Sequence, residues 1–192
     1  MLEVNQMAKV NKTKYALLGI LNHMSGSGYD IKKVCDSSIG HFWNENYGHI
    51  YPVLQRMEEE GLITKEVKQN DGRPAKNIFS ITGKGKEELD KWLLLPIEKE
   101  PIRSELLLKI FLSKDIPIKN IIELINGIKE DSQKDLIKYA EIDVLLRSGK
   151  VQADKKSLVL WLTTISYGKQ SEEAKIKWCD ETIKSLEEIK DF

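Results

Sequence analysis

The spacing of apolar residues changes at Gly61, and this change limits the folds that the chain can adopt. Residues 47–60 carry apolar side chains at helical spacing, whereas residues 62–82 form two runs rich in β-branched and aromatic residues. Asp71 and Gly72 separate these runs and are a strong turn signal. The sequence therefore predicts a helix, ended by Gly61, that leads directly into a two-stranded β-hairpin. The inward face of this helix is expected to consist of Ile50, Val53, Leu54, Met57 and Gly61.

Two shorter helices are expected before this one. The first spans residues 13–24 and is capped by its own Thr. The second follows a cap at Ser25 or Ser27 and stops at Gly40. Pro52 is expected in the first turn of the third helix, where its missing N–H is no loss.

The second half of the chain predicts long helices. A helix capped by Thr82 leads to Pro96 and Pro101, which bracket a charged connector, so we expect one domain over residues 1–95 and another over residues 96–192. Beyond a helix in residues 102–114, helices over 117–148 and 153–189 each carry a seam of mainly apolar residues, which favours coiled-coil-like packing. The first seam is Ile118, Ile121, Ile125, Ile128, Ser132, Asp135, Tyr139, Ile142 and Leu146, and the second is Leu158, Leu162, Ile165, Ile176, Cys179, Ile183 and Leu186. We therefore predict a mainly α fold that ends in an antiparallel helical hairpin.

Charge is balanced over the whole chain but not over the hairpin. Lys and Arg number 30, as do Asp and Glu, so no net charge draws the protein toward nucleic acid or membrane. Residues 64–86, however, hold a local excess of four positive charges. The apolar runs are far shorter than the roughly 20 residues that a membrane crossing needs. Because no signal segment or disulfide pattern is present either, we expect a cytoplasmic protein, with Met7 as an alternative start.

Three short helices followed by a basic hairpin is the order of a winged helix-turn-helix, whose third helix enters the major groove of DNA. On the outward face of this helix, Gln55 can pair with adenine, while Tyr51 and His49 can donate to phosphates. The acidic residues 58–60 lie at its C-terminal end, which is expected to point out of the groove. The expected DNA-binding residues are His49, Tyr51, Pro52, Gln55 and Arg56 on the helix, and Lys68, Arg73 and Lys76 on the hairpin. Taken singly, each of them is also explained as an ordinary surface residue, so only the combination is specific.

Several of these segments together resemble the PadR family of winged helix-turn-helix transcriptional regulators. The resemblance covers residues 13–93 and rests on "YALLGILNHMSGSGYDI", "GHIYPVLQRMEEEGLI", "GRPAKNIFSIT" and "GKEELDKW". Phe79 departs from the family pattern, in which a Tyr is usual, but it keeps the aromatic packing. The C-terminal region is similar to the longer version found in one branch of the family.

The resemblance implies a homodimeric repressor that binds a roughly palindromic stretch of double-stranded DNA, with the C-terminal helices forming the dimer. It also implies a small aromatic effector, since some relatives sense phenolic acids or flat drugs at the dimer interface. The candidate residues for such a site are Trp92, Trp161, Tyr167 and Trp178. Aromatic residues at helical spacing are more often packing residues than ligand contacts, so a purely structural role is the main alternative.

The sequence gives no sign of an enzyme, a metal site or a cofactor. Its three histidines, His23, His41 and His49, are scattered without catalytic or metal-ligand spacing. Two other functions stay open at this point. One is a winged helix used for protein interaction, with the helical hairpin as a scaffold, and the other is a MarR-like regulator that responds to a ligand.

Overall fold

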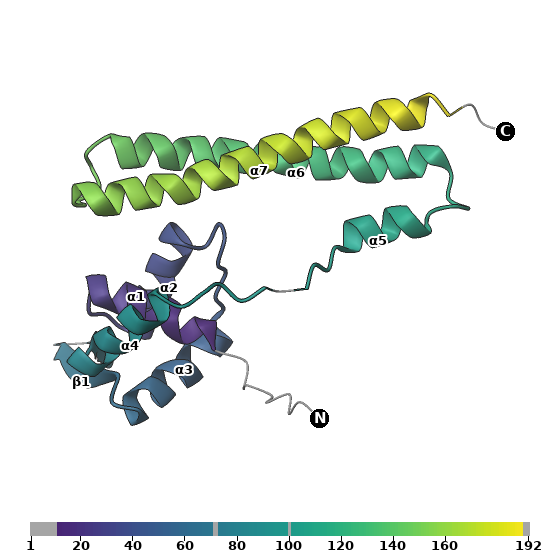
Figure 1. Ribbon diagram of the computed structural model, residues 1–192. Helices are drawn as coiled ribbons and strands as arrows, with labels where there is room; N and C mark the ends of the chain where they lie inside the picture. Colours follow the sequence, from purple (N-terminus) through teal and green to yellow (C-terminus); the bar gives the residue numbers. More distant parts are fainter. Residues whose placement is uncertain (1–10, 71–72, 100, 190–192) are drawn as a thin grey trace. The chain divides into compact units, whose positions relative to one another are not determined.

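Three helices open the N-terminal half, and polar side chains cap two of them. The structure is a computed structural model that describes residues 11–70, 73–99 and 101–189, without the side chains of Tyr47, Asn70, Arg73 and Pro74. Ser27 caps the second helix through reciprocal bonds with Asp30, and Asn46 caps the third by accepting from the His49 backbone N–H at 3.0 Å. The helices are α1 (Lys12–His23), α2 (Gly28–Ser38) and α3 (Tyr47–Glu59) (Figure 1).

Two predicted details of these helices are wrong. α1 has Asn11 rather than Thr13 as its N-cap, so Thr13 lies inside the helix. Pro52 is the sixth residue of α3 and does not belong to its first turn, because the Asn46 cap starts the helix five residues before it. The Pro52 ring therefore leaves the Gly48 carbonyl without its helical N–H partner, a defect that a proline in the first turn would avoid.

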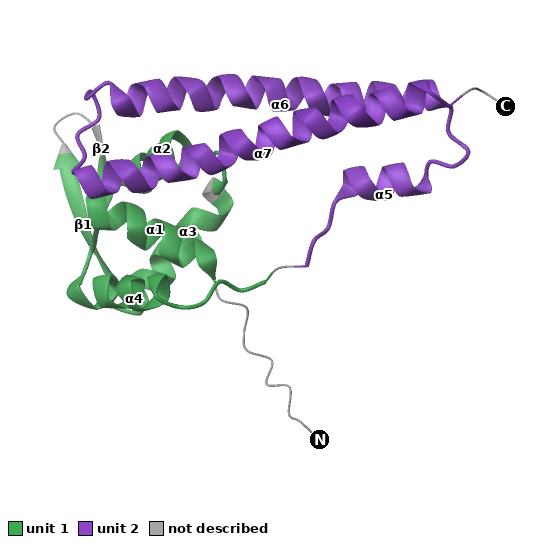
Figure 2. Ribbon diagram, turned by 45° about the horizontal axis from the view of Figure 1, so that its top comes forward, with its two compact units in different colours: residues 1–99 green, residues 100–192 purple. Residues whose placement is uncertain are grey.

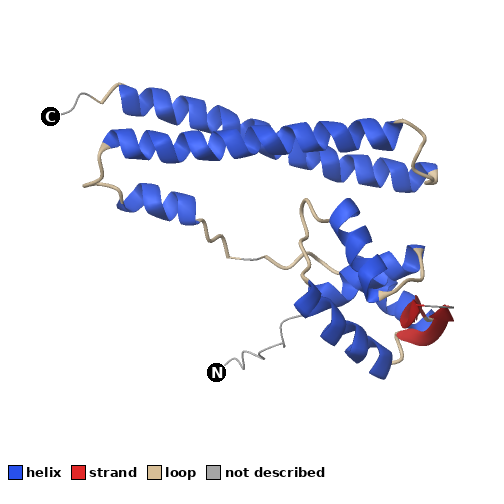
Figure 3. Ribbon diagram, turned by 180° about the vertical axis from the view of Figure 1, so that it is seen from behind, coloured by secondary structure: helices blue, strands red, loops and turns tan. Residues whose placement is uncertain are grey.

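The predicted hairpin follows α3 and consists of β1 (Ile63–Asn70) and β2 (Arg73–Ile81), paired antiparallel. Gly61 ends the helix as expected, with a positive φ of 70°. The predicted turn at Asp71 and Gly72 lies outside the described residues. Gly26, between α1 and α2, exchanges two backbone hydrogen bonds with Phe79 of β2, at 3.1 and 2.9 Å. These bonds tie the strands, red in Figure 3, to the start of α2.

α4 (Gly83–Leu93) closes the first unit and is fixed to both α1 and α3. Thr82 caps it as predicted, and Trp92 stacks on Tyr15 of α1 with ring centroids 4.4 Å apart. Lys84 donates at 2.7 Å to the carbonyl of Glu60, at the C-terminal end of α3. The helices thereby enclose one apolar core, whose fully buried side chains include Leu17, Leu18, Ile31, Ile50, Leu54 and Met57.

Glu88 adds an acid-sensitive contact between α4 and α1. Hydrogen bonds from Lys14 at 2.9 Å and Tyr15 at 3.0 Å hold the pKa of its carboxyl below the ordinary 4.5. A lowered pKa means that this contribution to stability is full above pH 4.5 and is lost as the pH falls through the lowered value. We expect Glu88→Gln to lower the melting temperature at neutral pH by roughly a few degrees, and the difference from wild type to shrink in acid. Thermal unfolding followed by circular dichroism tests this, and an equal difference at both pH values would contradict it.

The second unit is built on two long antiparallel helices that lie side by side (Figure 1). Every residue of the two predicted seams is buried or half-buried between them. The Tyr139 ring packs against Gly168, where a Cβ atom would lie 2.4 Å from it, and Lys129 pairs with Asp180 at 2.5 Å. The helices of this unit are α5 (Glu105–Leu112), α6 (Ile118–Arg147) and α7 (Lys155–Glu187).

The chain divides into two units, residues 1–99 and 100–192 (Figure 2). The mainly helical fold class, with three helices and a hairpin before long C-terminal helices, is confirmed. The exact domain boundary at residues 95 and 96 stays a prediction. Among the helices of the described ranges, none combines the length and apolar character that a membrane crossing requires.

Candidate nucleic-acid interface

α3 buries one side and exposes the other along its length. Ile50, Leu54 and Met57 have no exposed surface, and Val53 is half-buried. The five predicted DNA-binding residues of this helix, His49, Tyr51, Pro52, Gln55 and Arg56, are all exposed. At about 100° per residue they span an arc from Tyr51 at one flank to His49 and Arg56 at the other, with Gln55 and Pro52 between them.

The Gln55 side chain has a partner within the helix. Its amide donates to the Glu59 carboxylate at 3.2 Å, one turn further along α3. This bond uses one of the two amide N–H groups, so the other N–H and the carbonyl oxygen of Gln55 remain available for a base edge. Gln55 and Glu59 are four residues apart on a helix, a spacing that brings side chains together. The sequence could therefore have indicated this pair, but the predicted site does not include it. Glu58 is also engaged, because Lys65 of β1 donates to it at 2.9 Å.

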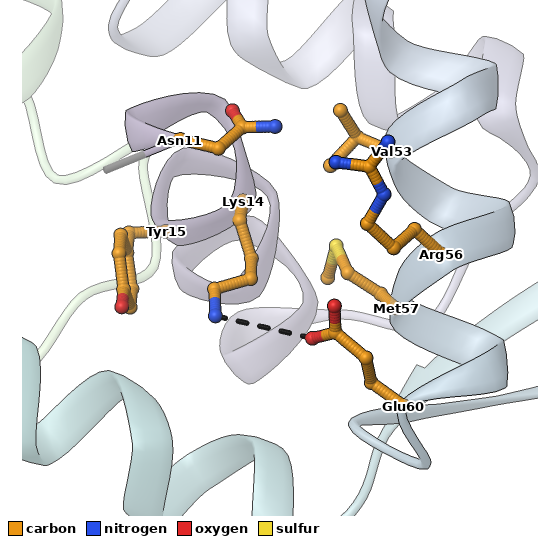
Figure 4. A pocket seen from close by; sticks show the side chains of 7 residues that line it. All are labelled: Asn11, Lys14, Tyr15, Val53, Arg56, Met57 and Glu60. Carbon is orange, nitrogen blue, oxygen red and sulfur yellow. Dashed lines mark ion pairs between the residues drawn. The ribbon is translucent and has the colours of Figure 1, made fainter. Parts of the chain in front are cut away.

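Arg56 lies at the edge of a pocket of about 210 Å³ between α1 and α3 (Figure 4). Glu60, at the end of α3, lies 3.9 Å from Lys14 within this pocket. Two of the three glutamates at this end of α3, Glu58 and Glu60, therefore lie near a lysine that offsets their charge, whereas Glu59 is bonded only to the neutral amide of Gln55. The lining residues are Asn11, Lys14, Tyr15, Val53, Arg56, Met57 and Glu60.

The hairpin places two lysines directly opposite each other. Lys68 of β1 and Lys76 of β2 are partners in the strand register, and both are exposed. Directly opposed residues point to the same face, and like charges in such positions destabilise a hairpin. Arg73 pairs with Asn70 close to the turn. The hairpin thus concentrates positive charge on one face at some loss of its own stability.

Fewer of the basic residues in the segment 64–86 belong to the hairpin than the sequence predicts. Lys84 and Lys86 belong to α4 rather than to the hairpin, and Lys84 is bonded to the end of α3. Lys65 is paired with Glu58. The cationic side chains left to the hairpin are those of Lys68 and Lys76, with Arg73 at the start of β2.

The candidate aromatic residues of an effector site are not gathered in one place. Trp92 is in the first unit, where it stacks on Tyr15. Trp161 and Tyr167 are six residues apart on α7 and point about 120° apart, and Trp178 is about 16 Å beyond Tyr167 along the helix. Tyr167 lines a surface hollow of about 410 Å³ together with Val159, Leu162, Thr163, Ser166 and Gln170. An effector site formed by these four residues stays a prediction.

Comparison with known proteins assigns this arrangement to a family. Residues 17–91 match the model of the transcriptional regulator PadR-like family, and residues 102–187 match that of the virulence activator alpha C-terminal region. The chain belongs to the PadR-like family. The second match places this PadR-like protein in the branch with the longer C-terminal region, as the resemblance implies.

Relatives of this PadR-like protein are known in several bacteria. The "Negative transcriptional regulator PadR" of Bacillus subtilis is 36% identical over 100 residues, which are 51% of this chain and 54% of that protein. The "Probable transcriptional regulator Rv1176c" of Mycobacterium tuberculosis is 26% identical over 91% of this chain and 97% of its own length. The crystal structure of Bacillus subtilis PadR in complex with operator DNA has the same fold, with a TM-score of 0.78 and 24% identity over 91% of this chain and 99% of that one.

Membership of the PadR-like family makes this protein a transcriptional regulator rather than an enzyme. Of the two regulator families considered from the sequence, PadR-like and MarR-like, the match therefore supports the PadR-like family. Within the part of the chain that the structure describes, no group of three or more His, Cys, Asp or Glu side chains is placed to hold a metal ion.

Proposed function

We propose that this PadR-like protein binds double-stranded operator DNA as a homodimer and represses transcription by blocking the site. α3 lies in the major groove, with Gln55 toward base edges and Tyr51 toward a phosphate, while the hairpin contacts the flanking backbone. The opposed pair of Lys68 and Lys76 carries the proposal. Two cations that repel in the free protein are neutralised when both meet a phosphate, so DNA binding relieves the repulsion.

Dimerisation is supported by apolar surface in the second unit. One winged helix buries only about 600 to 1,000 Å² on DNA, so useful affinity needs two half-sites, about 34 Å apart. Apolar side chains that stay exposed in the single chain are typical of a surface that another chain covers. They include Leu107, Leu108, Phe111 and Leu112 on α5, Val144 on α6, and Val159 and Leu160 on α7.

Repression is supported by the name of the Bacillus relative, a negative regulator, and it requires only tight binding over a promoter. The rival function, a winged helix that binds protein, has no need of two opposed lysines on the hairpin. A small aromatic effector and a cytoplasmic location stay predictions from the sequence.

Gln55→Ala and Lys76→Ala are expected to affect DNA binding in different ways. Loss of Gln55 should reduce discrimination at one base pair per half-site by about tenfold, because a base contact carries sequence information. Loss of Lys76 should weaken all sequences alike, because a phosphate contact carries no sequence information. A gel shift on the DNA upstream of the coding region, with every base pair of the site varied, measures both. Equal loss on all sequences for Gln55→Ala would contradict its assignment to the bases.

Phe111→Asp is expected to produce monomers. The side chain is 85% exposed in the single chain, and a charge in a covered apolar surface opposes association. Operator affinity should then fall by about a hundredfold or more, since only one half-site is bound. Light scattering gives the mass of the particle. Asn126→Asp, which adds the same charge at an exposed polar position of α6, is the control and should remain dimeric. A Phe111→Asp protein of unchanged mass would remove α5 from the proposed interface.

A further inference from the structure

The Tyr51 ring of α3 lies against the first residue of α2. A Cβ atom added to Gly28 would come within 2.7 Å of two carbons of this ring and 2.9 Å of its hydroxyl oxygen. Such distances are shorter than real contacts allow. The ring therefore rests directly on the backbone of Gly28, although 51% of the tyrosine surface remains exposed.

The backbone at Gly28 does not itself require glycine. Gly28 is the first residue of a regular helix, and the described residues with positive φ are Gly61 and Gly149. A residue with ordinary helical φ and ψ at this position could equally be alanine. A side chain at position 28 would meet the ring of Tyr51. This contact explains why position 28 is a glycine.

The surface on which the ring rests is held on two sides. Ser27 and Asp30 form a reciprocal cap at the start of α2, with bonds of 3.0 Å from the Ser27 backbone N–H and 2.6 Å from its hydroxyl to Asp30. Gly26 is bonded to Phe79 of the hairpin in both directions. Gly28 therefore belongs to a segment whose position relative to β2 is fixed, and the ring takes its position from that segment.

We infer that Gly28 is a positioning residue for DNA binding, which leaves room for the Tyr51 ring to lie on α2 and fixes its hydroxyl at the flank of the exposed arc of α3. This inference rests on the proposed function. A tyrosine held on a rigid backbone loses less freedom when its hydroxyl meets a phosphate than one that is free to rotate.

The test is a double-mutant cycle on operator affinity with Gly28→Ala, Tyr51→Ala and both together. Each single change is expected to weaken binding about tenfold, and the double variant about tenfold rather than a hundredfold, because Gly28 acts only through the ring. Gly19→Ala is the matched control, since nothing lies within 4 Å of its added Cβ in α1, and it should bind as wild type does. Melting curves separate folding from positioning: Gly28→Ala should be at least as stable as its parent in the Tyr51→Ala background.

The outcomes distinguish this inference from the function on which it rests. If wild-type protein binds the operator and Gly28→Ala binds equally well, the inference is wrong and the function stands. If Gly28→Ala weakens binding equally with and without the ring, Gly28 does not act through Tyr51, and the inference is again wrong. If the wild-type protein binds no duplex, the proposed function fails and the positioning role falls with it.

Discussion

Raising the salt concentration from about 50 to about 200 mM is expected to weaken operator binding roughly a thousandfold. The cationic side chains assigned to each hairpin, Lys68, Arg73 and Lys76, give about six phosphate contacts in a dimer, and each contact releases a counterion. The logarithm of the affinity should therefore fall against the logarithm of the salt concentration with a slope near about −5. Fluorescence anisotropy of a labelled duplex over a salt series measures this slope.

The same series with Lys76→Ala provides the internal comparison. Two phosphate contacts per dimer are removed, so the slope should become shallower by about 2. A response to salt that is flat in both proteins would argue against DNA binding and would favour the protein-interaction alternative.

Gly85→Ala is expected to destabilise the first unit severely. Its added Cβ would lie 2.1 Å from the backbone oxygen of Leu62. That oxygen cannot easily move, because the backbone N–H and the hydroxyl of Thr82 both donate to it at 3.0 Å. Overpacking against fixed backbone costs about 3 kcal/mol or more, which corresponds to a fall of about 10 °C or more in melting temperature for a unit of this size. Calorimetry of the whole protein should show the loss.

Gly83→Ala is the matched control for this prediction. It lies two residues earlier in the same helix, and nothing lies within 4 Å of its added Cβ. The change should leave the melting temperature unchanged or raise it slightly, because alanine favours helices. If both variants melt alike, the close approach of α4 to Leu62 does not limit stability.

Local patterns in the sequence were sufficient for the order of elements. The change of period at Gly61 is visible because a helix and a hairpin place apolar residues at different spacings. The seams of α6 and α7 are visible for the same reason, since even Ser132 and Asp135 occupy seam positions that the structure buries or half-buries. Once the apolar residues identify the inward face of α3, the helical periodicity also identifies the residues on its outward face.

The choice between competing local signals and the contacts between elements could not be predicted in this way. The start of α3 depends on the bond from the His49 backbone to Asn46, which competes with the preference of Pro52 for a first turn. The opposition of Lys68 and Lys76 depends on strand register, and a slip of one residue would move the partners apart. The close approach at Gly85 depends on how α4 packs, which no local pattern encodes.

α4 is attached to both α1 and α3, and this attachment bears on how a conformational change in the second unit would affect the first. The chain leaves α4 directly into the connector, and Lys84 joins this helix to the end of α3 while Trp92 joins it to α1. In the proposed dimer, a displacement applied through the connector would therefore reach α1 and α3 together through α4. If the protein binds DNA as the proposed dimer, we expect regulation to change the separation of its two winged helices on the duplex and to leave the structure of each intact.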